Sequence, residues 1–320
     1  MDNPQTPNSS PEWERRTLEK LAFAALDEQK SRRRWGIFFK AIGFIYLLVV
    51  LFAVVDWGSD AEHQERHTAM VSLSGVIQSK GEANAEKLIA ALQSAFEEKN
   101  SVGVVLRINS PGGSPVQAGM INDEIHRLRA KYPEKPLYAV IEDICASGGY
   151  YVAVAADKIY VNKASIVGSI GVLMDGFGFI GTMDKVGVER RLLTAGENKG
   201  FLDPFSPQAE AHKAHAQTML NDIHQQFIDV VKTGRGKRLK ESPEMFSGLM
   251  WTGLQSVQLG LVDEIGSVDS VARDVIKAEK VLDYSLKDNI AERFAKRLGA
   301  GAVNGFWNGF FETQMGTSLR

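Results

Sequence analysis

One serine stands where the sequence predicts that a strand gives way to a helix. Ser147 lies in I-E-D-I-C-A-S-G-G-Y-Y at 141–151, after an apolar run at 136–141 and before an alanine- and tyrosine-rich run at 150–156. A serine in such a turn exposes its hydroxyl, and the free N–H groups of the helix start attract negative charge. A nucleophile with an oxyanion hole requires this arrangement. The alternative is a helix-capping serine followed by closely packed glycines.

A second glycine-rich turn, R-I-N-S-P-G-G-S at 107–114, follows an apolar run at 102–108 that is typical of a buried parallel strand. Ligands of open α/β sheets bind at the carboxyl ends of the strands. Gly112 and Gly113 permit a backbone that turns N–H groups toward a ligand. We expect the strands at 102–108 and 137–141 to be neighbours, so that the loops after them meet. The alternative is a simple helix-starting turn.

A serine nucleophile also needs a base. None of the six histidines lies between residues 127 and 211, which disfavours a Ser–His pair. Lys199, in A-G-E-N-K-G-F-L-D-P-F, is the remaining candidate and would form a Ser–Lys pair. Apolar neighbours such as Phe201 and Phe205 can desolvate it, and burial would lower the pKa of the lysine and leave neutral amine as the base. The alternative is an exposed loop lysine.

The single cysteine, Cys145, is a rival nucleophile two residues before Ser147. We expect its side chain to point into the end of the strand, as most lone cysteines are buried. One cysteine excludes an internal disulfide and a cysteine-based metal cluster. The net charge of −2 gives no support to a nucleic-acid partner.

Strands and helices are predicted to alternate through the rest of the chain, which favours an α/β fold with a mostly parallel sheet and flanking helices. The predicted strands are 68–77, 102–108, 137–141, 158–161, 166–174 and 188–193. The predicted helices are 83–99, 115–131, 150–156, 179–186, 207–232, 252–261 and 267–281, with Ser206 as the cap and Pro207 as the first residue of the longest.

Residues 35–55 carry a single charge, Lys40, and as a helix would be about 31 Å long, enough to cross a bilayer. A buried core helix is the alternative. Basic residues precede this segment and acidic residues follow it, which predicts a cytoplasmic N-terminus and a catalytic part outside. The expected organisation is a tail at 1–34 with a short helix at 12–29, a transmembrane helix at 35–55, a linker at 56–68, a catalytic domain at 69–283 and a tail at 284–320.

Four ordered motifs together resemble the signal peptide peptidase A family, the S49 serine peptidases: N-S-P-G-G, D-I-C-A-S-G-G-Y, I-V-G-S-I-G-V and A-G-E-N-K-G-F-L-D-P-F. The resemblance extends over residues 70–276. It implies a ClpP/crotonase-like fold, with the N-terminal anchor and short length of the single-copy bacterial form. Asn198 departs from the aromatic or basic residue that often precedes the family's lysine.

The resemblance also implies roles for individual residues. Ser147 matches the nucleophile, Lys199 the general base and Ser169 the serine that positions the lysine amine. Gly113 and Gly148 match the oxyanion-hole donors. No metal or other cofactor is implied.

Short members of this family form a ring in which serine and lysine come from adjacent subunits. The resemblance therefore implies a homo-oligomer, an octameric ring, that cleaves remnant signal peptides and other apolar peptides at the membrane. The expected location is a bacterial inner membrane, bound through residues 35–55, with the catalytic domain periplasmic or extracellular. Two alternatives are a crotonase-like acyl-CoA enzyme and a catalytically inactive membrane scaffold of the same fold.

Overall fold

The computed structural model describes residues 11–54 and 65–286, and in the first range it leaves out the side chains of 50–54 and a few others. The chain divides into two units, Met1–Glu62 and His63–Arg320. The predicted linker at 56–68 lies largely outside the described residues, and so does the predicted tail beyond residue 286.

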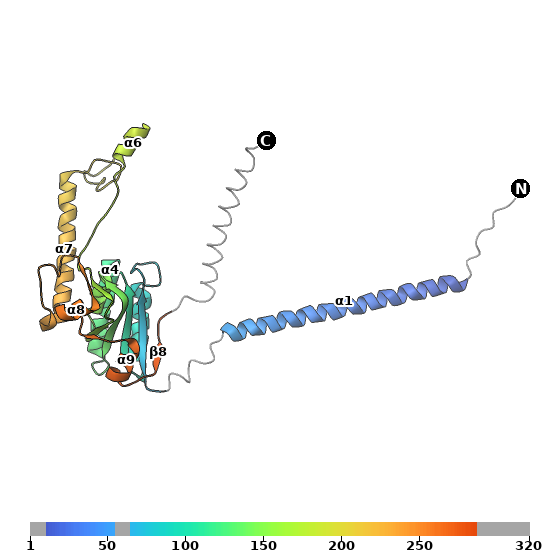
Figure 1. Cartoon of the computed structure of the whole chain (residues 1–320). Helices are drawn as coiled ribbons and strands as arrows, with labels where there is room; N and C mark the ends of the chain where they lie inside the picture. The colour runs from blue at the N-terminus through green and yellow to red at the C-terminus, as the bar shows by residue number, and fades with distance from the viewer. Residues whose placement is uncertain (1–10, 55–64, 287–320) are drawn as a thin grey trace. The chain divides into compact units, whose positions relative to one another are not determined.

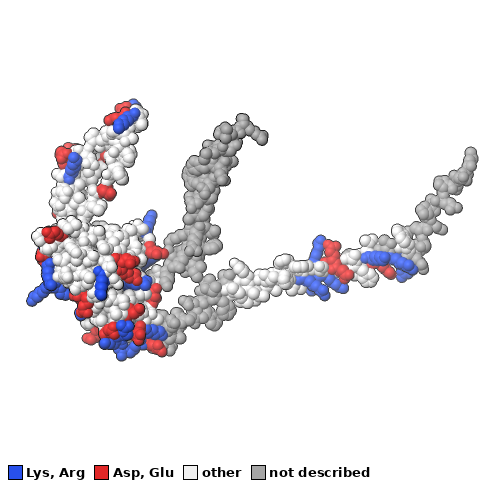
Figure 2. Space-filling view, in the orientation of Figure 1, with Lys and Arg blue, Asp and Glu red and all other residues white. Residues whose placement is uncertain are grey.

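The first unit contains one continuous helix, α1 (Pro11–Val54), of 44 residues. The sequence predicts a break between a polar helix and an apolar span, but the described helix has none. Its charged side chains lie between the N-terminal end and Lys40, and the described stretch that follows is free of them (Figure 2). Large apolar side chains from Trp35 to Val49 are exposed.

No helix among the described residues is both long and apolar enough to cross a membrane. The transmembrane helix predicted at 35–55 extends beyond the fully described residues. Val55 and the side chains of residues 50–54 lie outside what the structure describes.

The second unit is built on an eight-stranded sheet with the order β6-β5-β3-β2-β1-β8, in which β4 pairs with β3 and with β7. Every pairing is parallel except β5 with β6. The predicted α/β fold with a mostly parallel sheet is confirmed. The strands are β1 (His67–Ser74), β2 (Ser101–Ser110), β3 (Leu137–Ala146), β4 (Lys158–Val161), β5 (Ile166–Gly168), β6 (Met250–Thr252), β7 (Glu264–Ile265) and β8 (Val281–Asp283).

The helices of the second unit lie between these strands, and Figure 1 shows α4 packed on the sheet and α7 extending beyond it. They are α3 (Ala85–Glu97), α4 (Pro115–Lys131), α5 (Gly148–Ala153), α6 (Ile180–Val186), α7 (Glu210–Arg235), α8 (Gly253–Leu259) and α9 (Val268–Ser270). A 3₁₀ turn follows α7 at Gly236–Arg238, and a π-helical turn follows α9 at Val271–Ile276.

The main core lies between one face of the sheet and helices α3, α4 and α5. Alternate residues of β1, such as Val71 and Leu73, and the apolar faces of the helices, such as Leu92 and Ile125, are fully buried there. Burial of each such side chain contributes about 1.5–3 kcal/mol. A smaller cluster around Val105, with π-turn residues, covers part of the other face. The core thus fixes β2 and β3 side by side, and these strands carry the two glycine-rich turns.

The long strand β3 has different partners along its length. Its first half pairs with β4, from Tyr138 with Lys158 onward, and its last residues pair with β5, so that Ala146 lies opposite Gly168. The residues directly after β3 and β5 therefore come out at the same edge of the sheet.

Two predicted strands differ from the structure. The strand predicted at 166–174 ends at Gly168, because Gly168 and Ser169 have φ values of +118° and +54°, which an extended strand does not accommodate. The run at 188–193 forms no strand, and apolar side chains such as Leu193 remain exposed. The long helix begins at Glu210, with Ala209 as its cap, rather than at Pro207.

Candidate active site

Ser147 lies between the end of β3 and the first residue of α5, as the sequence predicts. Its side chain is half-buried and makes no capping hydrogen bond, so the interpretation as a helix-capping serine is wrong. Its backbone has φ 51° and ψ −124°, a conformation that a non-glycine residue rarely adopts. A strained serine in a sharp strand-to-helix turn is the form that a nucleophile takes when its hydroxyl must project from a sheet.

Two glycine amides lie beside this serine. A Cβ placed on Gly112 would stand 2.7 Å from the Ser147 Cβ and 2.7 Å from the Gly148 nitrogen, and one placed on Gly148 would stand 3.3 Å from the Gly113 nitrogen. The loops after β2 and β3 therefore meet. Within the described residues, the N–H groups of Gly113 and Gly148 have no hydrogen-bond acceptor. Two neighbouring N–H groups without acceptors are able to stabilise an oxyanion.

The glycine turn after β2 is fixed by its neighbours. Gly112 O accepts from Ile77 N at 2.8 Å, and Ser114 N donates to Ile77 O at 2.8 Å, which closes a short parallel bridge around Gly113. The Ser110 hydroxyl donates to Gly75 O at 2.7 Å and accepts from Gly112 N at 3.1 Å. The N–H of Gly112 thus donates to the Ser110 hydroxyl, whereas none of these bonds involves the N–H of Gly113.

Ser169 follows β5 and thus lies one strand away from Ser147. The two segments are joined directly, because Ser147 N donates to Gly168 O at 2.9 Å. Ser169 is half-buried with φ 54°, and its N–H donates to Leu249 O at 2.7 Å. The structure thus brings Ser147, Ser169 and the two glycines together at one edge of the sheet.

Cys145 is fully buried, and burial raises the pKa of its thiol far above the usual range. A thiol that stays protonated is a poor nucleophile. The position of Cys145 within the end of β3 agrees with the predicted orientation and removes it as a rival to Ser147.

Lys199 is not near these residues within one chain. The residue before it, Asn198, contacts His212 on the first turn of α7, whereas His224 on the same helix contacts the Ile170 carbonyl beside Ser169. The two histidines are about 18 Å apart along α7 at ~1.5 Å per residue. Figure 1 shows α6 and the start of α7 projecting away from the sheet.

Lys199 is also exposed, which contradicts the expected burial. Phe201 turns toward His212 and His215, and Phe205 stacks on Phe179 at 5.3 Å, so neither aromatic ring is available to cover the lysine. The expectation failed because the apolar neighbours in the sequence pack on other elements.

Sequence reasoning missed several residues that shape the site. Ser110 was passed over although its hydroxyl orders the glycine turn. His224 was not singled out, yet its Nε2 lies 3.2 Å from the Ile170 carbonyl. Nothing in the sequence indicates that His212 and His215 contact the lysine loop, as both do in the structure. Only the Asn-Ser-Pro-Gly-Gly motif signals one of these in advance, because it contains Ser110.

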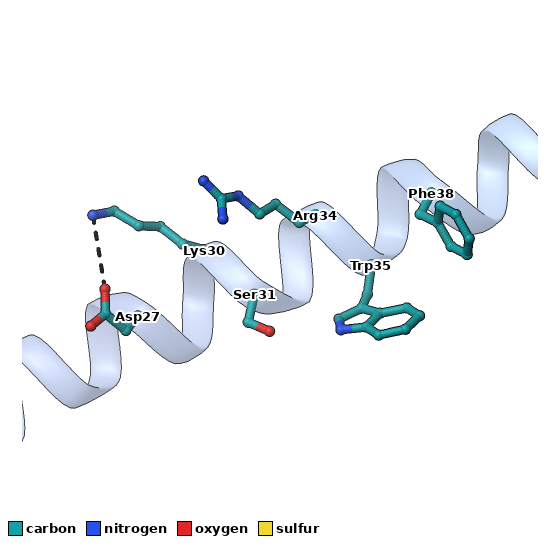
Figure 3. Close-up of a pocket in the computed structure, with 6 residues that line it drawn as sticks. All are labelled: Asp27, Lys30, Ser31, Arg34, Trp35 and Phe38. Atoms are coloured by element: carbon teal, nitrogen blue, oxygen red, sulfur yellow. Dashed lines mark ion pairs between the residues drawn. The ribbon is translucent and has the colours of Figure 1, made fainter.

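A separate hollow lies along α1 and holds none of these residues (Figure 3). It is lined by side chains from a single helix, with an ion pair of 4.0 Å between Asp27 and Lys30 at one end and the Trp35 and Phe38 rings at the other. An open groove on one helix offers no enclosed place for a reaction.

Comparison with known proteins places the site in a family. The family model described as peptidase family S49 matches residues 129–282, a range that includes Ser147, Ser169 and Lys199. A Synechocystis protein named as a candidate protease is 30% identical over 199 residues, which cover 62% of this chain and 69% of that protein. A candidate signal peptide peptidase SppA of Enterococcus faecium is 31% identical over 220 residues, which cover 66% of this chain and 63% of that protein.

A protein of Brucella melitensis named Na(+)/H(+) antiporter NhaA is 42% identical over 214 residues, 65% of this chain. The chain spans only 29% of the length of that relative. The S49 model matches within the second unit of this chain. The chain belongs to peptidase family S49.

Proposed function

We propose that this protein is a serine peptidase in which Ser147 is the nucleophile. One observation carries the proposal: a strained serine with an uncapped hydroxyl lies beside two glycine amides that have no acceptor among the described residues. Strain of this kind costs about 1–3 kcal/mol and persists mainly where function requires it. Membership in a peptidase family supports acyl transfer to water over the acyl-CoA chemistry of the crotonase-like alternative.

The reaction would proceed in two steps. Ser147 Oγ attacks the scissile carbonyl carbon and passes its proton to the neutral amine of Lys199. The N–H groups of Gly113 and Gly148 stabilise the oxyanion while the peptide C–N bond breaks and the leaving amine takes a proton from the lysine. Water then attacks the acyl ester, and Lys199 accepts its proton. The bond between Ser147 Oγ and the acyl carbon breaks, Lys199 returns the proton to Ser147 Oγ, and the second product leaves as the carboxylic acid. Ser169 is assigned to positioning the lysine amine.

Lys199 is proposed to act on the serine of a neighbouring copy. Within one chain the lysine loop is far from Ser147 and open to solvent. Burial against another chain is what would provide a neutral base. The segment that carries the lysine also exposes Leu173, Phe177 and Leu193, at 81%, 79% and 96% of their surface. Apolar exposure on this scale favours a covered interface, in keeping with an octameric ring.

Cleavage of a fluorogenic apolar peptide by the full chain tests this function. We expect Ser147→Ala and Lys199→Ala each to reduce kcat by a factor on the order of 10³ or more, as for other nucleophile–base pairs. Lys185→Ala is the matched control, because Lys185 is another exposed lysine and lies on α6, and this variant should retain wild-type kcat. Turnover by Ser147→Ala would refute the proposal, and it would leave an inactive scaffold of the same fold as the better account.

Signal peptides and other apolar peptides are the proposed substrates, with the protein attached to a bacterial inner membrane through residues 35–55 and its catalytic unit outside. The exposed apolar side chains between Trp35 and Val49 support attachment. Recovery of the full chain in carbonate-washed membranes decides the matter. Release of the wild-type chain from washed membranes would refute attachment. Retention of a Phe44→Asp/Leu47→Asp variant in these membranes would refute attachment through residues 35–55.

A further inference from the structure

The loop that carries Lys199 is held against the start of α7 by two histidines. His212 Nε2 lies 3.0 Å from Asn198 Oδ1. Because an amide oxygen only accepts hydrogen bonds, the imidazole Nε2 carries the proton and donates it. Asn198 directly precedes Lys199, so this bond restrains the backbone on one side of the lysine.

The other side of the lysine is restrained by Phe201. Its ring meets the imidazole of His212 at 5.3 Å and that of His215 at 5.7 Å, both edge to face. Aromatic pairs in this geometry contribute about 0.5–1.5 kcal/mol each beyond simple burial. His212 and His215 lie three residues apart and therefore share one face of α7. The helix thus contacts the chain before and after Lys199.

The loop between these contacts is a series of tight turns. Lys199 N donates to Gly196 O at 3.1 Å, and Phe201 N donates to Asn198 O at 3.0 Å. Leu202 has a positive φ of 53°. A loop wound this tightly moves as one piece, so a restraint at Asn198 and Phe201 sets the direction of the Lys199 side chain.

We infer that His212 and His215 are positioning residues that orient Lys199 for catalysis, His212 through Asn198 and both through Phe201. The inference rests on the proposed role of Lys199 as the base. Neither histidine touches the reacting atoms. Their effect is geometric, because a base displaced by about 1 Å from its acceptor loses on the order of 100-fold in rate.

The test uses kcat and KM of the full chain with the fluorogenic peptide. His212→Ala and His212→Asn should lower kcat by about 10- to 100-fold with little change in KM, because only the orientation of the base is lost. His212→Gln should restore most of kcat, because the glutamine Nε2 reaches the position of the histidine Nε2 and donates to Asn198. Lys213→Ala is the control that should match wild type, because Lys213 lies between the two histidines and pairs with the exposed Glu210.

Two further readouts separate positioning from general damage. Amide hydrogen exchange of residues 196–203 should be faster in His212→Ala than in wild type or Lys213→Ala, while exchange of the sheet stays unchanged. Asn198→Ala combined with His212→Ala should lower kcat less than the product of the two single effects, because both changes break one hydrogen bond.

The inference and the proposed function fail in different ways. If turnover depends on Ser147 and Lys199 but His212→Ala keeps wild-type kcat, only the positioning role is overturned. A His212→Gln variant as slow as His212→Ala also overturns the hydrogen-bond role. If the wild-type chain shows no turnover that depends on Ser147, the proposed function falls and the inference falls with it.

Discussion

The backbone of Ser147, at φ 51° and ψ −124°, imposes a cost that an alanine would share and a glycine would escape. We therefore expect the Ser147→Gly variant to be more stable than Ser147→Ala by about 1 kcal/mol in free energy of unfolding. Neither variant should cleave peptide. Equilibrium denaturation in urea measures the difference. Equal stability of the two variants would mean that the serine is not strained.

Two features of Gly113 make it hard to replace: the lack of space for a side chain and the proposed role of its N–H group in the oxyanion hole. A Cβ at this position would stand 2.1 Å from Ile77 O, and its φ of +145° is unfavourable for other residues. The loop of a Gly113→Ala variant must move, which displaces the N–H from the oxyanion position. We expect kcat to fall by about 100-fold or more and the unfolding free energy to fall by about 1–3 kcal/mol.

The control for this prediction is Gly119→Ala in α4. Nothing lies within 4 Å of a Cβ at Gly119, and alanine is the better helix former by about 1 kcal/mol. This variant should be at least as stable as wild type with full kcat. A Gly113→Ala enzyme that also keeps full kcat would exclude the Gly113 amide from the oxyanion hole.

At the scale of elements, α7 connects the lysine loop to the body of the sheet, and its C-terminal end is anchored by a buried ion pair. Arg235 donates to both oxygens of Asp263, at 2.8 and 3.0 Å, and to Gly260 O at 2.9 Å. Burial disfavours the charged carboxylate, but the hydrogen bonds and charge of Arg235 outweigh this effect, so the pKa of Asp263 is lowered. The bonds from Ile159 N and Arg238 act in the same direction.

The sign of the pH effect follows from this lowered pKa. A carboxylate with a folded-state pKa below its unfolded value contributes stability above the unfolded pKa, and that contribution is lost as pH falls through the folded pKa. Wild type should therefore lose stability below about pH 4. Asp263→Asn should be less stable than wild type at pH 7 by about 3–5 kcal/mol, because Arg235 stays buried without its counter-ion.

Thermal or urea unfolding between pH 3 and pH 7 measures both effects, and Asp263→Asn should show a shallower decline than wild type. Asp274→Asn removes a carboxylate that pairs with Arg273 on the open surface and should change little at any pH. Identical pH profiles for wild type and Asp263→Asn would contradict the role given to this pair.

The elements that the sequence predicts correctly are those whose pattern is set by burial within one chain. The helix at 115–131 and the strand at 158–161 appear with the predicted bounds, and the two glycine turns meet because β2 and β3 are neighbours. The run at 188–193 has the apolar content of a strand, but it has no strand to pair with and its apolar side chains are exposed. A strand without a partner leaves its backbone groups unpaired and gains nothing from the pattern.

The part of the candidate site that lies at the ends of strands could be predicted from the sequence, and the place of Lys199 could not. Ser147 and the glycines follow predicted strand ends, and parallel topology brings strand ends together. Ser169 was predicted inside a strand at 166–174, and it joins them because β5 ends at Gly168. Lys199 follows no strand, so its place depends on contacts that the sequence does not reveal, such as the bond from His212 to Asn198. Its expected burial next to Phe201 failed because that ring packs on α7.

At the scale of the whole molecule, one chain contains the parts of a site without assembling them. The proposed nucleophile and oxyanion donors are at the sheet edge, and the proposed base, Lys199, is at the far end of α7. If a ring places the lysine of each copy beside the serine of the next, Ser147→Ala and Lys199→Ala chains are each inactive but complement one another. Light scattering should also give a mass that is a multiple of the 35.2 kDa chain.

Co-expression of the two variants with different affinity tags tests this arrangement in assemblies purified through both tags. In an equal, random ring, about one site in four combines an intact serine with an intact neighbouring lysine, so activity should recover to about a quarter of wild type. Ser147→Ala co-expressed with the Ser147→Ala/Lys199→Ala double variant has no intact serine and should stay inactive. Doubly tagged assemblies of the two single variants that contain both chains and show no turnover would place the dyad within one chain, and α7 and its loop would then have to fold back onto the sheet to bring Lys199 to Ser147.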